Sequence, residues 1–194
     1  MRVWGIADLH LSFARPEPRE RYAARWRDHA AQIERNWRDA VGRDDLVLLP
    51  GDLSMARNHR ELQPDLAWID RLPGTKVLAP GNHDRWWNGV NKIRPMLRRS
   101  LLAVGGDAVA THGVIVCGTR GAAVSVDDNA PQTRAEAAEL AALDKALEHA
   151  KRLRTETDAL YVLWHYPPFD CYRRPGPCVE RFEAAGVTAC VYGH

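Results

Sequence analysis

The sequence predicts a mixed α/β fold, and three observations lead to that prediction. Short apolar runs alternate with longer segments in which apolar residues recur at helical spacing. Two turn signals in the middle of the chain, Gly105-Gly106-Asp107 and His112-Gly113, are typical of antiparallel hairpins. Polar clusters directly follow several apolar runs, as ligand-binding residues do at the ends of strands in α/β sheets. Early alternation followed by hairpins indicates both parallel and antiparallel pairing.

The first half of the chain contains three expected strands and three expected helices. The strands are residues 3–7, 46–49 and 76–79, and the helices are about 20–41, 62–72 and 89–99. In the first of these helices Tyr22, Trp26, Ile33 and Trp37 are spaced for one face, and Gly42 ends it. Pro73-Gly74 ends the second helix.

The second half contains five expected strands and two expected helices. The strands are residues 101–104, 108–111, 114–117, 159–164 and 188–192, and the helices are 134–154 and 179–185. The two turn signals separate the first three of these strands, so we expect those strands to pair antiparallel.

Length and composition favour one ordinary globular domain and exclude several classes of protein. A chain of 194 residues is long enough to bury a sizeable core. The net charge of +2 is too small to predict nucleic-acid binding by itself. No apolar run approaches the roughly 20 residues of a membrane span, and no secretory signal is present. The four cysteines form no C-x-x-C pair, which argues against a thiolate zinc site. We expect a cytoplasmic protein, and the sequence does not indicate its oligomeric state.

Residues with metal-binding side chains follow five of the predicted strands. They are Asp8 and His10, then Asp52, then Asn82 with His83 and Asp84, then His165, and finally His194. Because functional groups gather at the carboxyl edge of α/β sheets, the five segments are expected to meet in one crevice. Carboxylate, amide and imidazole ligands without a thiolate suit hard to borderline divalent metals. Each cluster alone is more often a turn, a helix cap or a packing residue, and the ordered set is what predicts a metal centre.

The motifs D-x-H, G-D, G-N-H-D, a strand-end His and G-H resemble those of the calcineurin-like metallophosphoesterase superfamily, over the span from Asp8 to His194. The longer context resembles a bacterial group of uncharacterised predicted phosphohydrolases within it. That context comprises residues 4–12, 81–87, 118–121 and 165–168. The resemblance implies a single domain over residues 1–194 and a four-layer α/β/β/α sandwich with two mixed β-sheets.

The resemblance also implies two divalent metal ions with separate ligand sets. The implied ligands of the first ion are Asp8, His10 and Asp52. Those of the second are Asp52, as a bridging carboxylate, with Asn82, His165 and His194. Attack of a metal-bridging hydroxide would make Asp52 and His83 the catalytic residues, with His83 as proton donor to the leaving oxygen. Manganese is favoured, with iron, zinc and nickel as alternatives.

Two departures from the family pattern shape the expected activity. The family motif G-H-x-H stops here at Gly193-His194, so we expect the natural protein to continue and the first metal site to be weaker or completed by solvent. Protein Ser/Thr phosphatases carry G-D-x-x-D-R-G, whereas Met55 and Ala56 stand at the Asp and Arg positions here. The expected substrate is therefore a small or nucleotide-like phosphodiester, or a phosphomonoester, and no phosphoprotein.

Three residues are candidates for substrate binding, although each has a plainer interpretation. Arg120 and Arg85 suit bidentate phosphate recognition, but an exposed arginine is more often a solvated charge. Trp86 is a candidate for stacking on a base, whereas packing in the core is the plainer interpretation for at least one of Trp86 and Trp87. The alternatives to an esterase are a non-catalytic binding module on the same fold and a nuclease. We expect neither a nucleic-acid partner nor a membrane.

Overall fold

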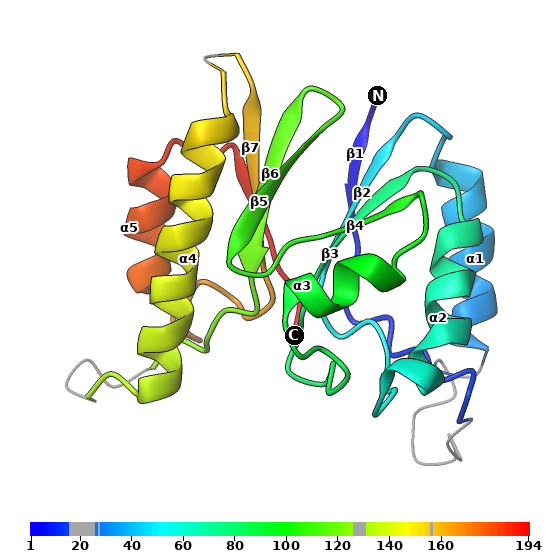
Figure 1. The fold of residues 1–194 in the computed structure, drawn as a ribbon. Coiled ribbons are helices and arrows are strands. Elements are labelled where there is room, and N and C mark those ends of the chain that lie inside the picture. The colour runs from blue at the N-terminus through cyan, green and yellow to red at the C-terminus, as the bar shows by residue number, and fades with distance from the viewer. Residues whose placement is uncertain (16–25, 27, 126–130, 156) are drawn as a thin grey trace.

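The computed structural model describes residues 1–15, 26, 28–125, 131–155 and 157–194. Two four-stranded sheets face each other, and helices cover the outer face of each sheet (Figure 1). The layer order is therefore α/β/β/α, which confirms the predicted fold class. Within the described residues, no helix is both long enough and apolar enough to cross a lipid bilayer.

The first sheet is parallel throughout and has the strand order β1-β2-β3-β4. Its strands are β1 (Val3–Gly5), β2 (Leu46–Pro50), β3 (Thr75–Ala79) and β4 (Leu101–Ala103). Helices α1 (His29–Ala40) and α2 (His59–Arg71) lie on its outer face (Figure 1). The expectation that both sheets are mixed is therefore wrong for this sheet. Each connection returns the chain to the end of the sheet where the previous strand began, so all four strands run in the same direction.

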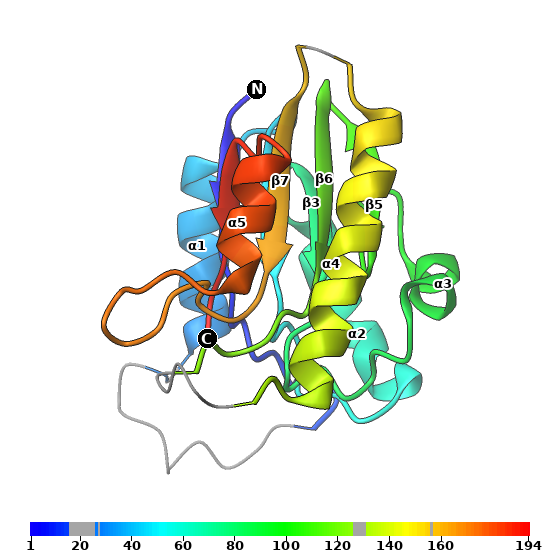
Figure 2. The ribbon, with the colours of Figure 1, turned by 90° about the vertical axis from the view of Figure 1, so that its left-hand side faces the viewer.

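The second sheet is mixed and has the order β5-β6-β7-β8. Its strands are β5 (Asp107–Thr111), β6 (Val114–Thr119), β7 (Ala159–Trp164) and β8 (Ala189–Val191). Only the β5–β6 pair is antiparallel. Helices α4 (Arg134–Leu153) and α5 (Pro177–Ala184) cover its outer face (Figure 2). The start of α4 is defined by a capping box between Thr133 and Glu136.

One of the two predicted hairpins is correct and the other is wrong. His112-Gly113 joins β5 to β6 as an antiparallel hairpin. Gly105-Gly106 instead carries the chain from the first sheet to the second, because β4 pairs with β3 and β5 pairs with β6. Gly106 has φ 83°, so the chain does turn at this glycine as predicted. A turn signal reports a change of direction and does not identify the strand that comes to lie alongside.

Two predicted helices are shorter than expected. The first begins at His29, because Asp28 is left-handed with φ 54°, and its predicted start at 20–25 lies outside the described residues. The third is divided into α3 (Val90–Ile93) and the 3-10 helix η3 (Arg94–Met96). Pro95 falls inside this segment and removes a backbone donor, which explains the break.

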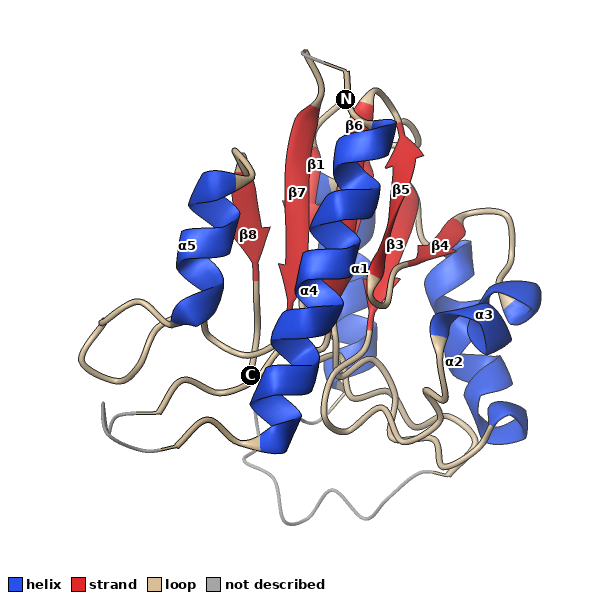
Figure 3. Ribbon diagram, turned by 60° about the vertical axis from the view of Figure 1, so that its left-hand side comes forward, coloured by secondary structure: helices blue, strands red, loops and turns tan. Residues whose placement is uncertain are grey.

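The core has three layers, and β2 shows how one strand serves two of them. Leu46 and Leu48 pack between the sheets, beside Val77 of β3 and Leu163 of β7. Their neighbours Val47 and Leu49 pack outward against the helices. All five residues of β2 are buried, as in a central parallel strand covered on both faces. Loops that follow the parallel strands gather at one end of the molecule (Figure 3).

Candidate metal centre

Six predicted ligands follow five parallel strands at that end of the molecule. Asp8 and His10 follow β1, Asp52 follows β2, Asn82 follows β3, His165 follows β7 and His194 follows β8. The structure brings these residues together. Two groups form, in each of which the nitrogen and oxygen ligand atoms lie within 4.8 Å of one another. The first group is Asp8, His10 and Asp52, and the second is Asp52, His165 and His194.

Asp52 belongs to both groups and lies between their imidazoles. Its Oδ2 is 3.7 Å from Nε2 of His10 and 3.5 Å from Nε2 of His165. Nε2 of His10 is also 3.7 Å from Oδ1 of Asp8. Oδ1 of Asn82 lies beside the second group, 2.8 Å from Nε2 of His165. This arrangement places one carboxylate where two neighbouring cations would share it.

The backbone at this site adopts conformations that non-glycine residues seldom take. Asp8, His10, Asp52 and His194 have φ values of 58°, 42°, 53° and 71°. Each left-handed residue costs about 1–2 kcal/mol, a cost that clusters at functional sites. Gly81 allows the loops to meet, because a Cβ there would lie 2.1 Å from Oδ1 of Asp52. Four residues with metal-binding side chains therefore have strained backbones and lie close to one another.

Hydrogen bonds hold the ligand loops in register. The N–H of Asp8 donates to O of Gly51 at 3.1 Å, and the N–H of His10 donates to O of Asp52 at 2.9 Å. The N–H of His83 donates to Oδ1 of Asp52 at 2.8 Å, and the N–H of His194 donates to Oδ2 of Asp8 at 2.9 Å. Each carboxylate therefore has one oxygen fixed by the backbone and the other directed to the group.

The second nitrogen of His165 sets the role of the first. Nδ1 lies 2.9 Å from O of Pro50, so it must carry a proton and donate to that carbonyl. In the neutral ring Nε2 then presents a lone pair beside Oδ1 of Asn82, and two acceptor atoms face each other. A cation bound by both atoms would satisfy them, as would a proton on Nε2 that is donated to Asn82. The residues present therefore fit a divalent metal ion.

Burial and neighbouring charges shift the pKa values of three groups. The lowered pKa values of His10 and Asp52 favour the unprotonated forms that bind metal, whereas the raised pKa of His165 favours a proton that a metal ion would have to displace. Burial lowers the pKa of His10, and the carboxylates of Asp52 and Asp8 oppose it only in part. Burial works against a charged Asp52, but hydrogen bonds from His165 and from the backbone of His83 outweigh it and lower the pKa. For His165 burial is again the largest effect, and the hydrogen bond and charge of Asp52 overcome it and raise the pKa.

Asp84 has a supporting role that the sequence did not reveal. Its side chain turns away from the two ligand groups and is buried. It accepts N–H bonds from Gly81 at 2.8 Å, Leu53 at 2.9 Å and Ser54 at 3.1 Å. Burial raises the pKa of this carboxyl to about 6. Asp84 thus ties the loop after β2 to the loop after β3 behind the ligands. The G-N-H-D motif signalled a carboxylate there without indicating its direction.

The prediction that Trp86 stacks on substrate is wrong. Its side chain is 1% exposed and belongs to the core beneath the first sheet. Its Nε1 donates to Oδ1 of Asp84 at 3.1 Å, which fixes the indole inward. Trp87 is the half-buried member of the pair and lines a hollow beside Asn82. Adjacent residues in a loop face different ways, and the sequence did not say which indole pointed inward.

Arg85 and Arg120 line the same hollow, next to the candidate metal centre. Nη2 of Arg120 pairs with Oε1 of Glu139 at 2.9 Å, and Glu139 is a residue that no sequence motif singled out. The two arginines therefore lie near Asn82 as expected, and their contact with substrate stays a prediction. The same holds for the assignment of the ligands to metal ions.

Three comparisons place this chain among known proteins. It is 35% identical over 83 residues to the gene 66 protein of Mycobacterium phage D29, covering 43% of this chain and 40% of that protein. It is 35% identical over 82 residues to the gene 66 protein of Mycobacterium phage L5, covering 42% and 39% respectively. Each match thus spans well under half the length of these curated relatives.

The fold resembles that of phosphopantetheinyl hydrolase from Mycobacterium tuberculosis. The TM-score is 0.54 at 14% identity, over 99% of this chain and 82% of that one. A sequence model described as calcineurin-like phosphoesterase matches residues 1–194. With ligand loops at the shared edge of two facing sheets, and with this match over the whole sequence, the chain belongs to the calcineurin-like phosphoesterase family.

Proposed function

We propose that this chain is a metal-dependent phosphoesterase that hydrolyses a small or nucleotide-like phosphodiester, or a phosphomonoester. The observation that carries the proposal is the position of Asp52, whose carboxylate belongs to two separate ligand groups. Family membership implies divalent metal ions, and the shared carboxylate supports a pair of them.

The proposed ligand sets follow the two groups. Asp8, His10 and Asp52 hold one ion, and Asp52, Asn82, His165 and His194 hold the other. Bound ions supply positive charge for the phosphoryl oxygens and a hydroxide nucleophile at neutral pH. The oxygen and imidazole donors suit manganese, iron, zinc or nickel, and manganese is our first choice.

His83 is the proposed proton donor to the leaving oxygen. Its backbone N–H is fixed on Asp52, while its side chain is exposed. The His83 ring lies 5.5 Å from the ring of His10, so the imidazole stands at the mouth of the ligand cluster. An imidazole at this position can donate a proton to a leaving alkoxide.

Substitution of His83 tests the proposal directly. We expect His83→Ala to lower hydrolysis of a phosphodiester with an alcohol leaving group, thymidylyl-(3′→5′)-thymidine, with added Mn²⁺ by about 10²–10⁴-fold, because a general acid contributes that much to expulsion of an alkoxide. Metal content, measured by elemental analysis, should stay unchanged, because alanine keeps the backbone N–H on Asp52. His112→Asn, which removes an exposed imidazole from the β5–β6 hairpin, is the matched control.

Other outcomes distinguish the competing functions. Tight metal binding by the unaltered chain without turnover of any phosphoester would favour a non-catalytic binding module. Cleavage of single-stranded DNA with a steep dependence on salt would favour a nuclease. Equal turnover by the His83→Ala and unaltered chains would remove His83 from the mechanism.

A further inference from the structure

The hollow beside the candidate metal centre has the size and position of a second substrate site. Its volume is about 340 Å³, within the range of small-molecule sites. Asn82 forms part of its wall and lies 2.8 Å from Nε2 of His165, so the hollow borders the second group. Its other walls come from both sheets, since Arg85 and Trp87 follow β3, Gly105 follows β4 and Arg120 follows β6.

Arg120 is held in place from the side. Oε1 of Glu139 pairs with Nη2 of Arg120 at 2.9 Å. Oε2 of Glu139 accepts from Oγ1 of Thr119 at 2.6 Å and from the N–H of Gly121 at 3.2 Å. A guanidinium has five N–H donors, so this single ion pair orients Arg120 and leaves donors for a ligand.

Arg85 has no comparable partner. Its side chain is exposed and makes no hydrogen bond or ion pair to any residue that the structure describes. The two carboxylates of the wall are both occupied, Glu139 as above and Asp84 by backbone N–H groups. Two guanidiniums therefore face the hollow without a free acidic neighbour, and the hollow favours an anion.

The remaining wall is flat and partly apolar. A Cβ added to Gly105 would lie 3.2 Å from Cζ2 of Trp87, so the indole lies against the backbone of Gly105. Trp87 in turn packs on Trp86, with ring centroids 5.4 Å apart. Trp87 therefore adds an aromatic side chain to a wall that also carries two positive charges.

We infer that this hollow binds a second phosphate of the substrate, one sugar removed from the phosphate that is hydrolysed. Arg85 and Arg120 contact that second phosphate, and Glu139 is the positioning residue of Arg120. A phosphomonoester carries up to two negative charges and three acceptor oxygens, which two guanidiniums match better than they match a carboxylate. The inference rests on the proposed function, because Asn82 belongs to both the hollow and the proposed metal centre.

A matched pair of chromogenic substrates tests the inference. Thymidine 5′-(4-nitrophenyl phosphate) is compared with the same ester carrying a 3′-phosphate. We expect kcat/KM of the unaltered chain to be about 10- to 100-fold higher for the second substrate, as charge-assisted hydrogen bonds to one phosphate predict. Arg85→Ala and Arg120→Ala should each move that ratio toward one. Arg99→Ala removes an exposed arginine near the opposite end of β4 and should leave the ratio unchanged.

A binding measurement separates this inference from the proposed function. Calorimetry on the chain with a chelator present compares thymidine 3′,5′-bisphosphate with thymidine 5′-monophosphate. Tighter binding of the bisphosphate that Arg120→Ala abolishes supports the site even where neither ester is hydrolysed. Hydrolysis of both esters at equal rates, with equal affinity for both nucleotides, overturns the site and leaves the esterase intact. A preference that survives both arginine substitutions also overturns it.

Discussion

The two ends of β2 carry aspartates with opposite surroundings. Asp45, before the strand, accepts from the N–H of Arg2 at 2.7 Å, from Nε1 of Trp4 at 3.1 Å and from the N–H of Gly42 at 3.0 Å. These donors hold the pKa of Asp45 well below its usual range. Asp52, after the strand, lies among imidazoles on a left-handed backbone. At the start of β2, which we call the closed end, the carboxylate is satisfied by hydrogen bonds within the protein. At the end of β2, which we call the open end, the carboxylate faces imidazoles that could share a ligand with it.

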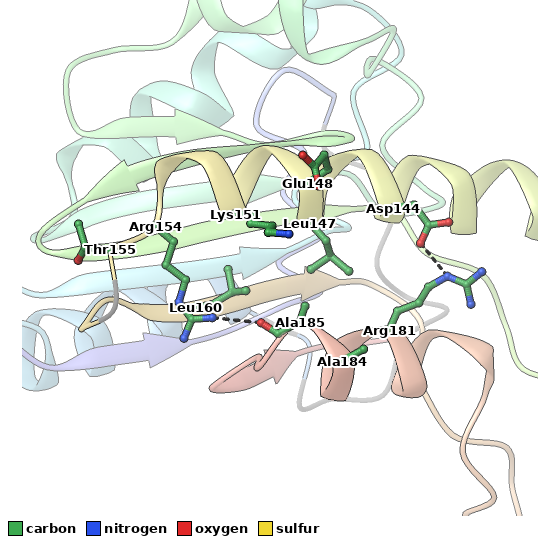
Figure 4. A pocket seen from close by; sticks show the side chains of 10 residues that line it. All are labelled: Asp144, Leu147, Glu148, Lys151, Arg154, Thr155, Leu160, Arg181, Ala184 and Ala185. Carbon is green, nitrogen blue, oxygen red and sulfur yellow. Dashed lines mark hydrogen bonds and ion pairs between the residues drawn. The ribbon is translucent and has the colours of Figure 1, made fainter.

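The hollows of the molecule show the same contrast. The groove between α4 and α5 has a volume of about 630 Å³, larger than the one beside Asn82 (Figure 4). Its arginines are already used, since Nε of Arg181 pairs with Asp144 at 2.8 Å and Nη1 of Arg154 donates to O of Ala185 at 3.1 Å. In the smaller hollow Arg120 is also paired, with Glu139, whereas Arg85 has no hydrogen bond or ion pair from its side chain to a described residue. The smaller hollow therefore differs from the larger groove in having an arginine without such a partner.

Asp52→Asn gives the largest expected effect and tests the open end. Asparagine tolerates the left-handed backbone and keeps the shape of the side chain, so the change removes mainly one negative charge. We expect Mn²⁺-stimulated phosphodiesterase activity to fall by about 10³-fold or more, since metal ions supply several kcal/mol of charge stabilisation. Bound metal should fall in parallel, as elemental analysis would show.

The stability of the Asp52→Asn chain sharpens the comparison. The charge of Asp52 helps to raise the pKa of Asp84, which shows that the two carboxylates oppose one another. The lowered pKa of Asp52 nonetheless means that its charge stabilises the folded chain near neutral pH, so Asp52→Asn should lower Tm slightly. A large fall in Tm with activity retained would mean that Asp52 is a structural residue like Asp45.

Asp45→Asn is the matched change at the closed end. An amide keeps one acceptor but turns an N–H₂ group toward donors that now lack a partner, which destabilises the fold. We expect Tm to fall by several degrees, measured by differential scanning calorimetry. Specific activity and metal content per folded molecule should not change. Loss of metal from this variant would contradict the separation of the two ends.

The sequence predicted much of this fold because the buried strands are legible locally. Residues 46–49 and 77–79 are short apolar runs, and they became central parallel strands. The long helix was equally clear, since residues 134–154 are rich in Ala and Leu. The partner of β4 was missed because Gly105-Gly106 specifies a turn and leaves the neighbouring strand to tertiary packing.

The candidate site was predicted as a set of residue types, and its geometry was not. Chain order and strand ends were enough to gather Asp8, Asp52 and His165 at one edge. Directions required the structure, because Trp86 turned inward and Asp84 bound backbone N–H groups. A glycine in the sequence suggests a left-handed backbone, whereas an aspartate or a histidine does not, so the left-handed ligand residues could not be predicted. Glu139 acts only through Arg120, so it left no local pattern.

Lys76, near the start of β3, is a second charged group at the same end of the sheet as Asp45, and its hydrogen bonds are likewise made within the protein. It is fully buried, and its Nζ donates to O of Leu72, to O of Asp70 at 3.3 Å and to Oγ of Ser100 at 3.1 Å. Burial lowers its pKa to about 8 from an ordinary value of 10.5. The ammonium thus caps the end of α2 while losing its hydration.

The smallest expected effect follows from this lowered pKa. Between pH 8 and 10.5 the folded chain has lost the Lys76 proton while the unfolded chain still holds it, so the free energy of unfolding rises with pH. In Lys76→Met that rise, on the order of 1–3 kcal/mol, should be absent. Urea unfolding across this range measures it, with Lys145→Met, an exposed lysine of α4, as control. Parallel pH profiles for the unaltered and Lys76→Met chains would show that Lys76 keeps an ordinary pKa. The burial of charge at this end of the sheet would then have no effect on stability.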